Sequence, residues 1–143
     1  MRAGRAHNNS GESMVEVVQG VVAVLQRDGA LLVIQRAAGI PLGGAWCFPG
    51  GGLLPDESEV EAVIREVREE VGLLVRPTQR LWVWERPDGG LRLHWWGAEL
   101  EGGVLTANPA EVQTAAWLNP ADIRLLPGLL PGNLEFLDRY HPG

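Results

Sequence analysis

A chain of 143 residues with 45% hydrophobic and 21% charged residues has the composition of a single globular domain with a real hydrophobic core. Its net charge of −6 argues against a general nucleic-acid binder, which would carry a basic stripe, although a small phosphate substrate stays open because it arrives with metal ions. Cys47 is the only cysteine, so no internal disulfide forms, and we expect a reducing, cytoplasmic location. No apolar run reaches the ~20 residues of a membrane span.

The first part of the chain predicts a leader followed by a hairpin. Residues 1–13 lack the apolar segment of a signal peptide, and we expect a disordered leader before a single domain at 14–143. The valine-rich stretch Val15–Gln26 predicts a strand or two short strands. An Asp-Gly turn at Arg27–Ala30 connects it to a returning strand at Leu31–Arg36.

A glycine-rich loop at 37–45 comes next, followed by a short buried strand at Trp46–Phe48. The run Gly50-Gly51-Gly52 then predicts a loop whose backbone can approach a metal ion or a phosphate closely.

A helix is predicted after this loop, with clear signals at both ends. Ser58 and Glu61 form a capping box at its start, and Gly72 lies where a left-handed residue ends a helix. At 100° per residue, one apolar stripe faces the core and contains Val60, Ile64, Val67 and Val71, with Val63 at its edge.

The same helix carries an acidic cluster that stability alone does not explain. Glu66, Glu69 and Glu70 share a neighbouring face, where they repel one another. They also crowd the last turns, where the helix dipole disfavours negative charge. Because a divalent cation bound by hard oxygen ligands would compensate for this repulsion, the cluster predicts a metal site.

The remaining elements alternate strands and loops before a last helix. In chain order, we expect a strand at Leu73–Glu85, a turn at 87–90, a strand at Leu91–Glu101, a loop at Gly102–Val112, a short strand at Thr114–Leu118 and a helix at Asn133–Tyr140 with Leu134 and Leu137 in the core. Strands outnumber helices, and hairpins mix with one crossover helix. This order predicts one α+β or α/β/α domain.

The stretch Gly51–Leu73 matches the pattern G-x5-E-x7-R-E-U-x-E-E-x-G-U at every specified position, namely Gly51, Glu57, Arg65, Glu66, Val67, Glu69, Glu70, Gly72 and Leu73. This is the Nudix box, and the chain resembles the Nudix hydrolases. The resemblance implies an α/β fold, an α/β/α sandwich with a mixed central sheet. It also implies hydrolysis of a nucleoside diphosphate linked to another group, with Mg²⁺ or Mn²⁺ as cofactor.

By similarity, the metal ligands are Glu66, Glu69 and Glu70, aided by the carbonyl of Gly50. Glu57 would support the site through water or a second metal. Such ions neutralise charge on phosphate oxygens and lower the pKa of a bound water.

Two further roles follow from the resemblance. Arg65 would orient the glutamates, the alternative being an exposed ion pair on the helix. The general base is either a box glutamate such as Glu66 or a glutamate in a later loop. Glu111 occupies such a loop, although it is equally read as a surface glutamate, and Glu99 and Glu101 are weaker candidates.

Two positions inside the box depart from common family usage. Leu54 stands where an acidic residue is frequent, which would alter metal stoichiometry or substrate range. Asp56 stands where glycine is frequent, and aspartate tolerates left-handed backbone geometry well enough for the loop to form.

Marker residues of other Nudix branches are missing. The tyrosine of the dinucleoside polyphosphate branch and the SQPWPFPxS segment of the NADH branch are absent, and Pro87 is slightly short of the spacing of the ADP-ribose branch. The run from Leu31 through Arg36 to Gly51 resembles the MutT-like branch instead. Arg36 would meet a phosphate or the nucleotide, or simply end a strand.

The segment Leu130–Asn133 resembles the Pro-x-Asn of the MutT-like branch. Its amide both donates and accepts, which suits the edge of 8-oxoguanine, whereas the alternative for Asn133 is an ordinary N-cap. Of the six tryptophans, Trp82 and Trp84 share a face of their strand. His94 and Trp96 share a face of the next strand, and Trp95 points opposite; most are packing residues, but Trp95 or Trp96 would offer a wall to a base.

Three hypotheses follow. The first is a Mg²⁺- or Mn²⁺-dependent pyrophosphohydrolase that acts on a nucleoside triphosphate such as 8-oxo-dGTP, with no nucleic-acid polymer or membrane as partner. The second changes the substrate to ADP-ribose, another nucleotide sugar or a capped RNA end. The third is a non-catalytic domain that senses a nucleotide. The sequence leaves monomer and homodimer open.

Overall fold

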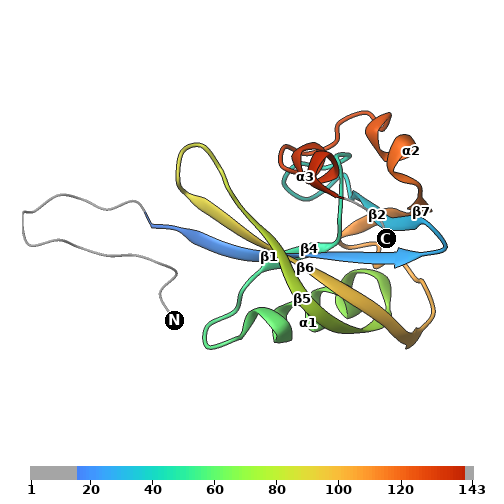
Figure 1. Cartoon of the computed structure of the whole chain (residues 1–143), viewed down its shortest axis with the longest axis horizontal. Helices are drawn as coiled ribbons and strands as arrows, with labels where there is room; N and C mark the ends of the chain where they lie inside the picture. The colour runs from blue at the N-terminus through green and yellow to red at the C-terminus, as the bar shows by residue number, and fades with distance from the viewer. Residues whose placement is uncertain (1–15, 141–143) are drawn as a thin grey trace, which may run out of the picture.

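The computed structural model describes residues 16–140, and the leader expected at 1–13 lies outside this range. A mixed sheet forms the centre, with α1 (Glu59–Val71) on one face and α2 (Pro120–Arg124) and α3 (Asn133–Arg139) on the other (Figure 1). This three-layer arrangement confirms the predicted α/β class. Within the described part of the chain, no helix is long and apolar enough to cross a membrane.

The strands agree with the predicted ones to within a few residues at most ends. They are β1 (Val18–Arg27), β2 (Ala30–Arg36), β3 (Trp46–Cys47), β4 (Gly50–Gly52), β5 (Leu73–Glu85), β6 (Leu91–Gly103) and β7 (Val112–Leu118). The main path of the sheet has the order β3-β2-β1-β6-β5, with β7 paired to β2 and β4 paired to β1.

The β1–β6 pair is parallel, and the other strand pairs are antiparallel. The three glycines at 50–52 do not form the loop that we expected. They form β4, with Gly50 opposite Val22 and Gly52 opposite Gly20. Glycine-rich segments usually avoid regular pairing. Here the pairing holds the glycine backbone in a fixed position beside β1.

Both faces of β1 are buried, because a helix layer covers each side of the sheet. Val21, Ala23 and Leu25 belong to the core cluster that includes the buried face of α1. Val22 and Val24 point the other way, into the cluster under α2 and α3. A continuous valine run therefore builds two cores at once, as the period of two along a strand requires.

The ends of α1 are those predicted from the sequence. The Ser58 hydroxyl accepts from the N–H of Glu61, the Glu61 carboxylate accepts from the N–H of Ser58, and Gly72 ends the helix with φ 72°. The predicted apolar stripe is displaced, however. Val60 is 38% exposed, whereas Ala62 and Val63 are buried together with Val67 and Val71, so the helix is rotated relative to the predicted centre of the stripe.

The C-terminal region differs more from the prediction. α2, a five-residue helix, was not predicted. Its N-cap Asn119 accepts from the N–H of Asp122 at 2.8 Å, and Pro120 occupies the first turn. In α3 the predicted core position Leu134 is wrong, because it is 46% exposed, while Leu137 is buried as expected. A helix of this length offers too few turns for its buried face to be read from periodicity.

A glycine at the end of α1 is required by its backbone geometry. We expect Gly72→Ala to lower the free energy of unfolding by about 1–2 kcal/mol, since an L-residue disfavours the left-handed conformation. Its added Cβ would also lie 3.0 Å from the carbonyl oxygen of Val104. Urea denaturation measures this. Gly39→Ala is the matched control, because its Cβ would meet nothing within 4 Å and its stability should change little.

Candidate functional site

The centre of the site is the contact between α1 and the glycine strand β4. A Cβ on Gly51 would lie 2.2 Å from Oε2 of Glu66, and one on Gly50 would lie 2.1 Å from the carbonyl oxygen of Val21. Only glycine allows the backbone to pass between β1 and the Glu66 carboxylate. Close packing therefore requires glycine at both positions, 50 and 51.

Arg65 donates hydrogen bonds to three of the acidic residues of the box. Its Nε donates to Glu57 at 2.7 Å and its Nη1 to Glu66 at 2.6 Å and Glu69 at 3.1 Å. Its Nη2 donates to the carbonyl of Gly52 and to Glu57, both at 2.9 Å. These five hydrogen bonds match the five N–H donors of a guanidinium, so every donor of the group has a partner.

The exposed ion pair that was the alternative reading of Arg65 does not describe this geometry. The side chain of Arg65 is 20% exposed, and those of Glu57 and Glu66 are 11% and 12% exposed. Charged groups at this depth interact more strongly than a surface pair, because solvent screens them less. Arg65 therefore fixes the orientation of the carboxylates.

The loop between β4 and α1 confirms the expectation for the backbone of Asp56. Asp56 has φ 62° and adopts the left-handed conformation in place of glycine. The N–H of Leu54 donates to Oε1 of Glu57 at 2.9 Å, while the Leu54 side chain is exposed. This loop thus helps to hold Glu57 against Arg65.

Glu70 is the most deeply buried carboxylate of the box, at 5% exposure, and it accepts a hydrogen bond from the N–H of Gly50 at 2.9 Å. Burial, followed by the negative charge on Glu66, raises the pKa of Glu70 to about 8. Burial also raises the pKa of Glu66, although its bonds with Arg65 oppose this. Glu69 is half-exposed and turned toward Arg65.

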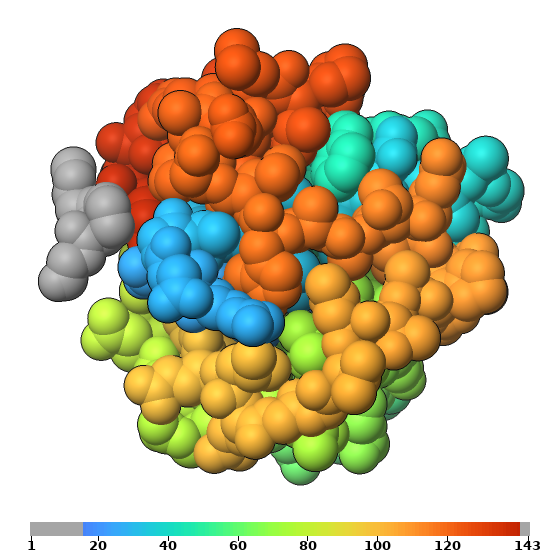
Figure 2. Space-filling model, turned by 90° about the vertical axis from the view of Figure 1, so that its right-hand side faces the viewer, coloured from blue at the N-terminus to red at the C-terminus, as the bar shows by residue number. Residues whose placement is uncertain are grey.

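Glu111 faces these carboxylates from the segment that follows β6. That segment lies against the end of α1, since the N–H groups of Thr106 and Asn108 donate to the carbonyls of Val71 and Glu70 at 2.8 and 2.9 Å. Figure 2 shows the segment, in light orange, in front of green α1. The charge of Glu111 raises the pKa of both Glu66 and Glu70.

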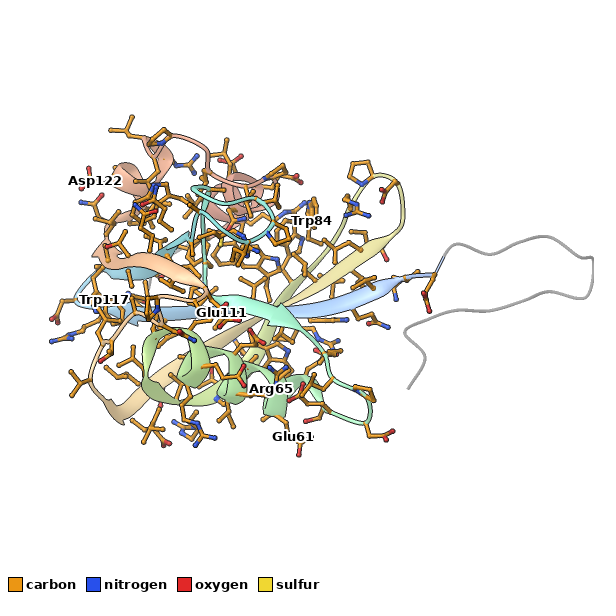
Figure 3. All side chains as sticks on the ribbon, turned by 180° about the vertical axis from the view of Figure 1, so that it is seen from behind. Glu61, Arg65, Trp84, Glu111, Trp117 and Asp122 are labelled. Carbon is orange, nitrogen blue, oxygen red and sulfur yellow. The ribbon has the colours of Figure 1, made fainter. Side chains whose placement is uncertain are left out.

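Figure 3 shows Glu111 at the level of the sheet, with Arg65 on one side of the sheet and Trp84 on the other. Asn108, whose N–H ties the segment to the helix end, was not predicted as part of the site. By contrast, the weaker candidates Glu99 and Glu101 are exposed on β6 and pair with Arg76.

The donor set suits a divalent cation. Within residues 16–140, no three acidic, histidine or cysteine side chains already form a ready coordination cluster. The chemistry fits nevertheless: Glu66 and Glu70 are buried hard-oxygen donors that repel each other, and a cation would remove the cost of that repulsion. Glu69 and the carbonyl of Gly50 remain expected ligands.

Arg36 lies at the edge of the same region. Its Nε donates to the carbonyl of Pro41 at 2.8 Å, which ties the end of β2 to the loop that follows it. Its positive charge lowers the pKa of both Glu70 and Cys47. Burial dominates for Cys47, however, and raises the pKa of its thiol to about 12.

Asn133 is not the N-cap, because that position belongs to Gly132. Its side chain is buried, and Oδ1 accepts from the N–H of Phe48 at 3.0 Å while Nδ2 donates to the carbonyl of Leu130 at 3.1 Å. The amide thus joins α3 to the segment after β3. The predicted free edge for a purine is taken up by these bonds.

The tryptophan predictions need correction. Trp95 has no exposed surface and packs against Phe136 at 4.5 Å between ring centroids, so it offers no wall to a base. Trp96 points to the α1 side, where its Nε1 donates to Glu59 at 2.8 Å. The alternation of the three residues His94, Trp95 and Trp96 across the strand is as predicted.

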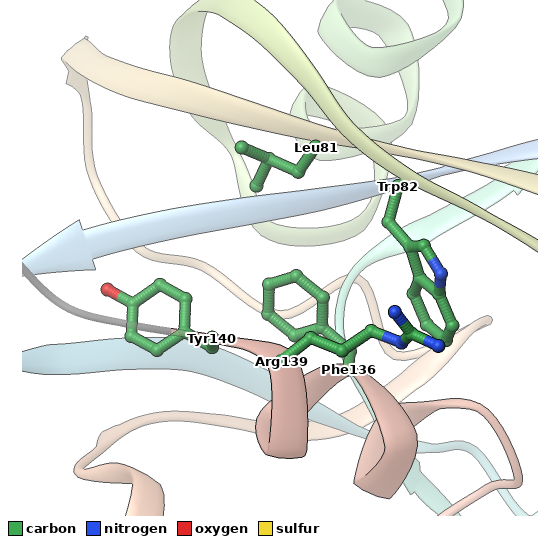
Figure 4. Close-up of a pocket in the computed structure, with 5 residues that line it drawn as sticks. All are labelled: Leu81, Trp82, Phe136, Arg139 and Tyr140. Atoms are coloured by element: carbon green, nitrogen blue, oxygen red, sulfur yellow. The ribbon is translucent and has the colours of Figure 1, made fainter.

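A hollow of about 340 Å³ lies elsewhere, between β5 and α3, and is lined by Leu81, Trp82, Phe136, Arg139 and Tyr140 (Figure 4). It contains no acidic side chain of the box. The carboxylate site and this aromatic hollow are therefore separate.

The buried carboxylate Glu70 gives the stability a distinctive dependence on pH. Its folded-state pKa of about 8 exceeds the value of ~4.3 expected in the unfolded chain, so between these values the folded state binds the proton more tightly. In EDTA, the free energy of unfolding should therefore fall as pH rises from about 5 to 8. Glu70→Gln should lose this fall. Urea denaturation at several pH values measures this. If the free energies of unfolding of wild type and Glu70→Gln depend on pH in the same way, the raised pKa of Glu70 is contradicted.

Comparison with known proteins agrees with this geometry. A profile of the NUDIX domain matches residues 14–140. The chain is 32% identical over 128 residues to the CTP pyrophosphohydrolase of Escherichia coli (strain K12), covering 88% of this chain and 93% of that protein. It is 27% identical over 125 residues to a candidate 8-oxo-dGTP diphosphatase of Bacillus subtilis (strain 168), covering 87% and 80%.

A solved structure has the same fold. The crystal structure of a MutT NUDIX hydrolase from Burkholderia pseudomallei superposes with a TM-score of 0.75 and 27% identity, covering 87% of this chain and 98% of that one. The profile match spans nearly the whole chain, and the box is complete. The chain therefore belongs to the Nudix family of hydrolases.

Proposed function

We propose that this enzyme is a pyrophosphohydrolase that uses Mg²⁺ or Mn²⁺ to cleave a nucleoside triphosphate into the monophosphate and pyrophosphate. The observation that carries the proposal is the set of buried carboxylates held by Arg65 against the glycine strand. CTP and 8-oxo-dGTP are the first substrates to test, because the similar proteins from E. coli and B. subtilis carry those names.

The chemistry requires water to attack a phosphorus atom surrounded by negative oxygens. A divalent cation at Glu66 and Glu70 would neutralise phosphate charge and lower the pKa of a bound water. The attack breaks one phosphoanhydride P–O bond, and the proton of the water passes to a carboxylate.

The residues of this chain supply the rest. Glu66 and Glu111 both face the site and are the two candidates for the proton acceptor. Arg65 keeps Glu57 and Glu66 aligned through its hydrogen bonds. Arg36 presents positive charge beside Glu70, where it would meet a phosphate of the substrate.

The test is a phosphate-release screen against nucleotides and nucleotide sugars with Mg²⁺. We expect hydrolysis of at least one nucleoside triphosphate by the wild type. Glu69→Gln should lose at least about 100-fold in kcat, since even groups behind a metal ligand contribute 10–100-fold. The variant should keep its fold, because it removes a like charge from α1. Glu85→Gln is the control, as that exposed glutamate pairs with Arg92 outside the box.

Other outcomes would redirect the proposal. Hydrolysis of ADP-ribose or another nucleotide sugar far above every triphosphate would make the substrate assignment wrong. Tight nucleotide binding with no turnover would favour a sensing domain over an enzyme. A Glu69→Gln variant as active as Glu85→Gln would contradict the role of the box glutamates.

A further inference from the structure

The first turn of α1 is fastened to the sheet by a polar cluster outside the box consensus. Glu59 accepts from Nε of Arg80 at 3.0 Å, from Nη2 of Arg80 at 2.6 Å and from Nε1 of Trp96 at 2.8 Å. The Arg80 guanidinium also lies 6.0 Å from the centre of the Trp96 ring. One carboxylate on the helix therefore joins β5 to β6.

The cluster continues into the sheet. His94 places Nδ1 3.5 Å from Oε2 of Glu59 and Nε2 2.8 Å from Oε1 of Gln19 on β1. Its side chain is 9% exposed, and Nδ1 has no hydrogen-bond partner among residues 16–140. We call Gln19, Glu59, Arg80, His94 and Trp96 the Glu59 cluster. It draws side chains from α1, β1, β5 and β6.

The Glu59 cluster adds a polar contact to the apolar packing of the first half of the helix. Among the first five helical residues, Ala62 and Val63 are buried in the core, whereas Val60 is 38% exposed. The Glu59 side chain is 20% exposed and is therefore fixed more firmly than a surface glutamate. Glu59 thus holds the very first turn, which lies before the buried pair, to β5 and β6.

Anchoring at this point bears directly on the site. Glu59 follows Glu57 by two residues, and Glu57 forms two of the five hydrogen bonds of Arg65. The Nη2 of Arg65 must also reach the carbonyl of Gly52 at 2.9 Å. A small rotation or slide of the first turn would change these distances together with the approach of Glu66 to Gly51.

We propose that Glu59 is a positioning residue: by fixing the first turn of α1 to β5 and β6, it sets the geometry of Arg65 and the metal-binding carboxylates. This inference rests on the proposed function. It goes beyond the box, since Glu59 occupies one of the unspecified positions of the motif. Misplacement by about 1 Å can cost an enzyme on the order of 100-fold, so modest disorder at this turn would be visible in kinetics.

The experiment compares Glu59→Ala and Glu59→Gln with Glu85→Ala. Glu85 is a suitable control because it also pairs with an arginine, Arg92. That pair joins β5 to β6 without involving α1. Three quantities are measured at a temperature where all variants are folded: urea stability, Mn²⁺ affinity without substrate by electron paramagnetic resonance, and kcat and KM.

We expect Glu59→Ala to weaken Mn²⁺ binding and lower kcat by about 10-fold each, as for other groups that orient metal ligands, with KM within twofold. Glu59→Gln should recover part of both losses, because its amide oxygen still accepts from Trp96. Glu85→Ala should change neither quantity. If Glu59→Ala does not fold, Trp96→Phe, which keeps a ring and removes the N–H, should lower Mn²⁺ affinity by about threefold.

A purely structural role predicts a different pattern. If Glu59→Ala lowers stability but leaves Mn²⁺ affinity and kcat within twofold of wild type, the positioning role is wrong. An unchanged Mn²⁺ affinity in Trp96→Phe, where Glu59→Ala cannot be studied, would overturn it equally. Mn²⁺ affinity needs no substrate, so a wild type that hydrolyses nothing would refute the proposed function while this test still stands.

Discussion

The site depends on one side chain, the Arg65 guanidinium, whose five N–H donors bind two carboxylate oxygens of Glu57, one each of Glu66 and Glu69, and the carbonyl of Gly52. Without this group, acidic residues at such depth would repel one another and lose their fixed orientation. A lysine would offer only three donors from a single point and could not reproduce the planar arrangement. The arginine also ties the loop before α1 to the helix itself.

The second constraint is steric. Because Gly51 passes directly against the Glu66 carboxylate, there is no room for a side chain at this point between α1 and β4. The same short stretch of sequence therefore defines the capping of the helix, its approach to the sheet and the placement of the carboxylates. This placement of the carboxylates is electrostatically unfavourable, since Glu70 is buried beside Glu66 and its pKa rises to about 8. Functional sites often accept such local strain, and a bound cation would relieve it.

Local signals predicted the parts of the fold that depend on neighbours in sequence. The capping box at Ser58 and the left-handed Gly72 belong to this class, because each satisfies backbone groups within a few residues. The acidic face of α1 also stood out, since its charges contradict the dipole and repulsion rules that govern ordinary helices.

Features that depend on distant residues could not be predicted in this way. Asn133 binds the backbone of Phe48, 85 positions earlier, so its amide was misassigned to a cap or a base. The burial of Trp95 depends on where α3 packs, which no period along β6 reveals. No local pattern in the sequence distinguishes Glu59, whose partners Arg80 and Trp96 are brought to it only by the fold. Tertiary partners decide such roles, and sequence spacing carries little information about them.

We propose that α1 and β4 together form the binding site for a divalent cation. Anomalous diffraction from crystals soaked in Mn²⁺ is the decisive measurement, because the metal is located without assuming any substrate. We expect an anomalous peak within coordination distance of carboxylate oxygens of Glu66 and Glu70, about 2.0–2.3 Å as for hard cations of this size. A peak at an unrelated surface site, or none at all in crystals that are saturated with Mn²⁺, would contradict it.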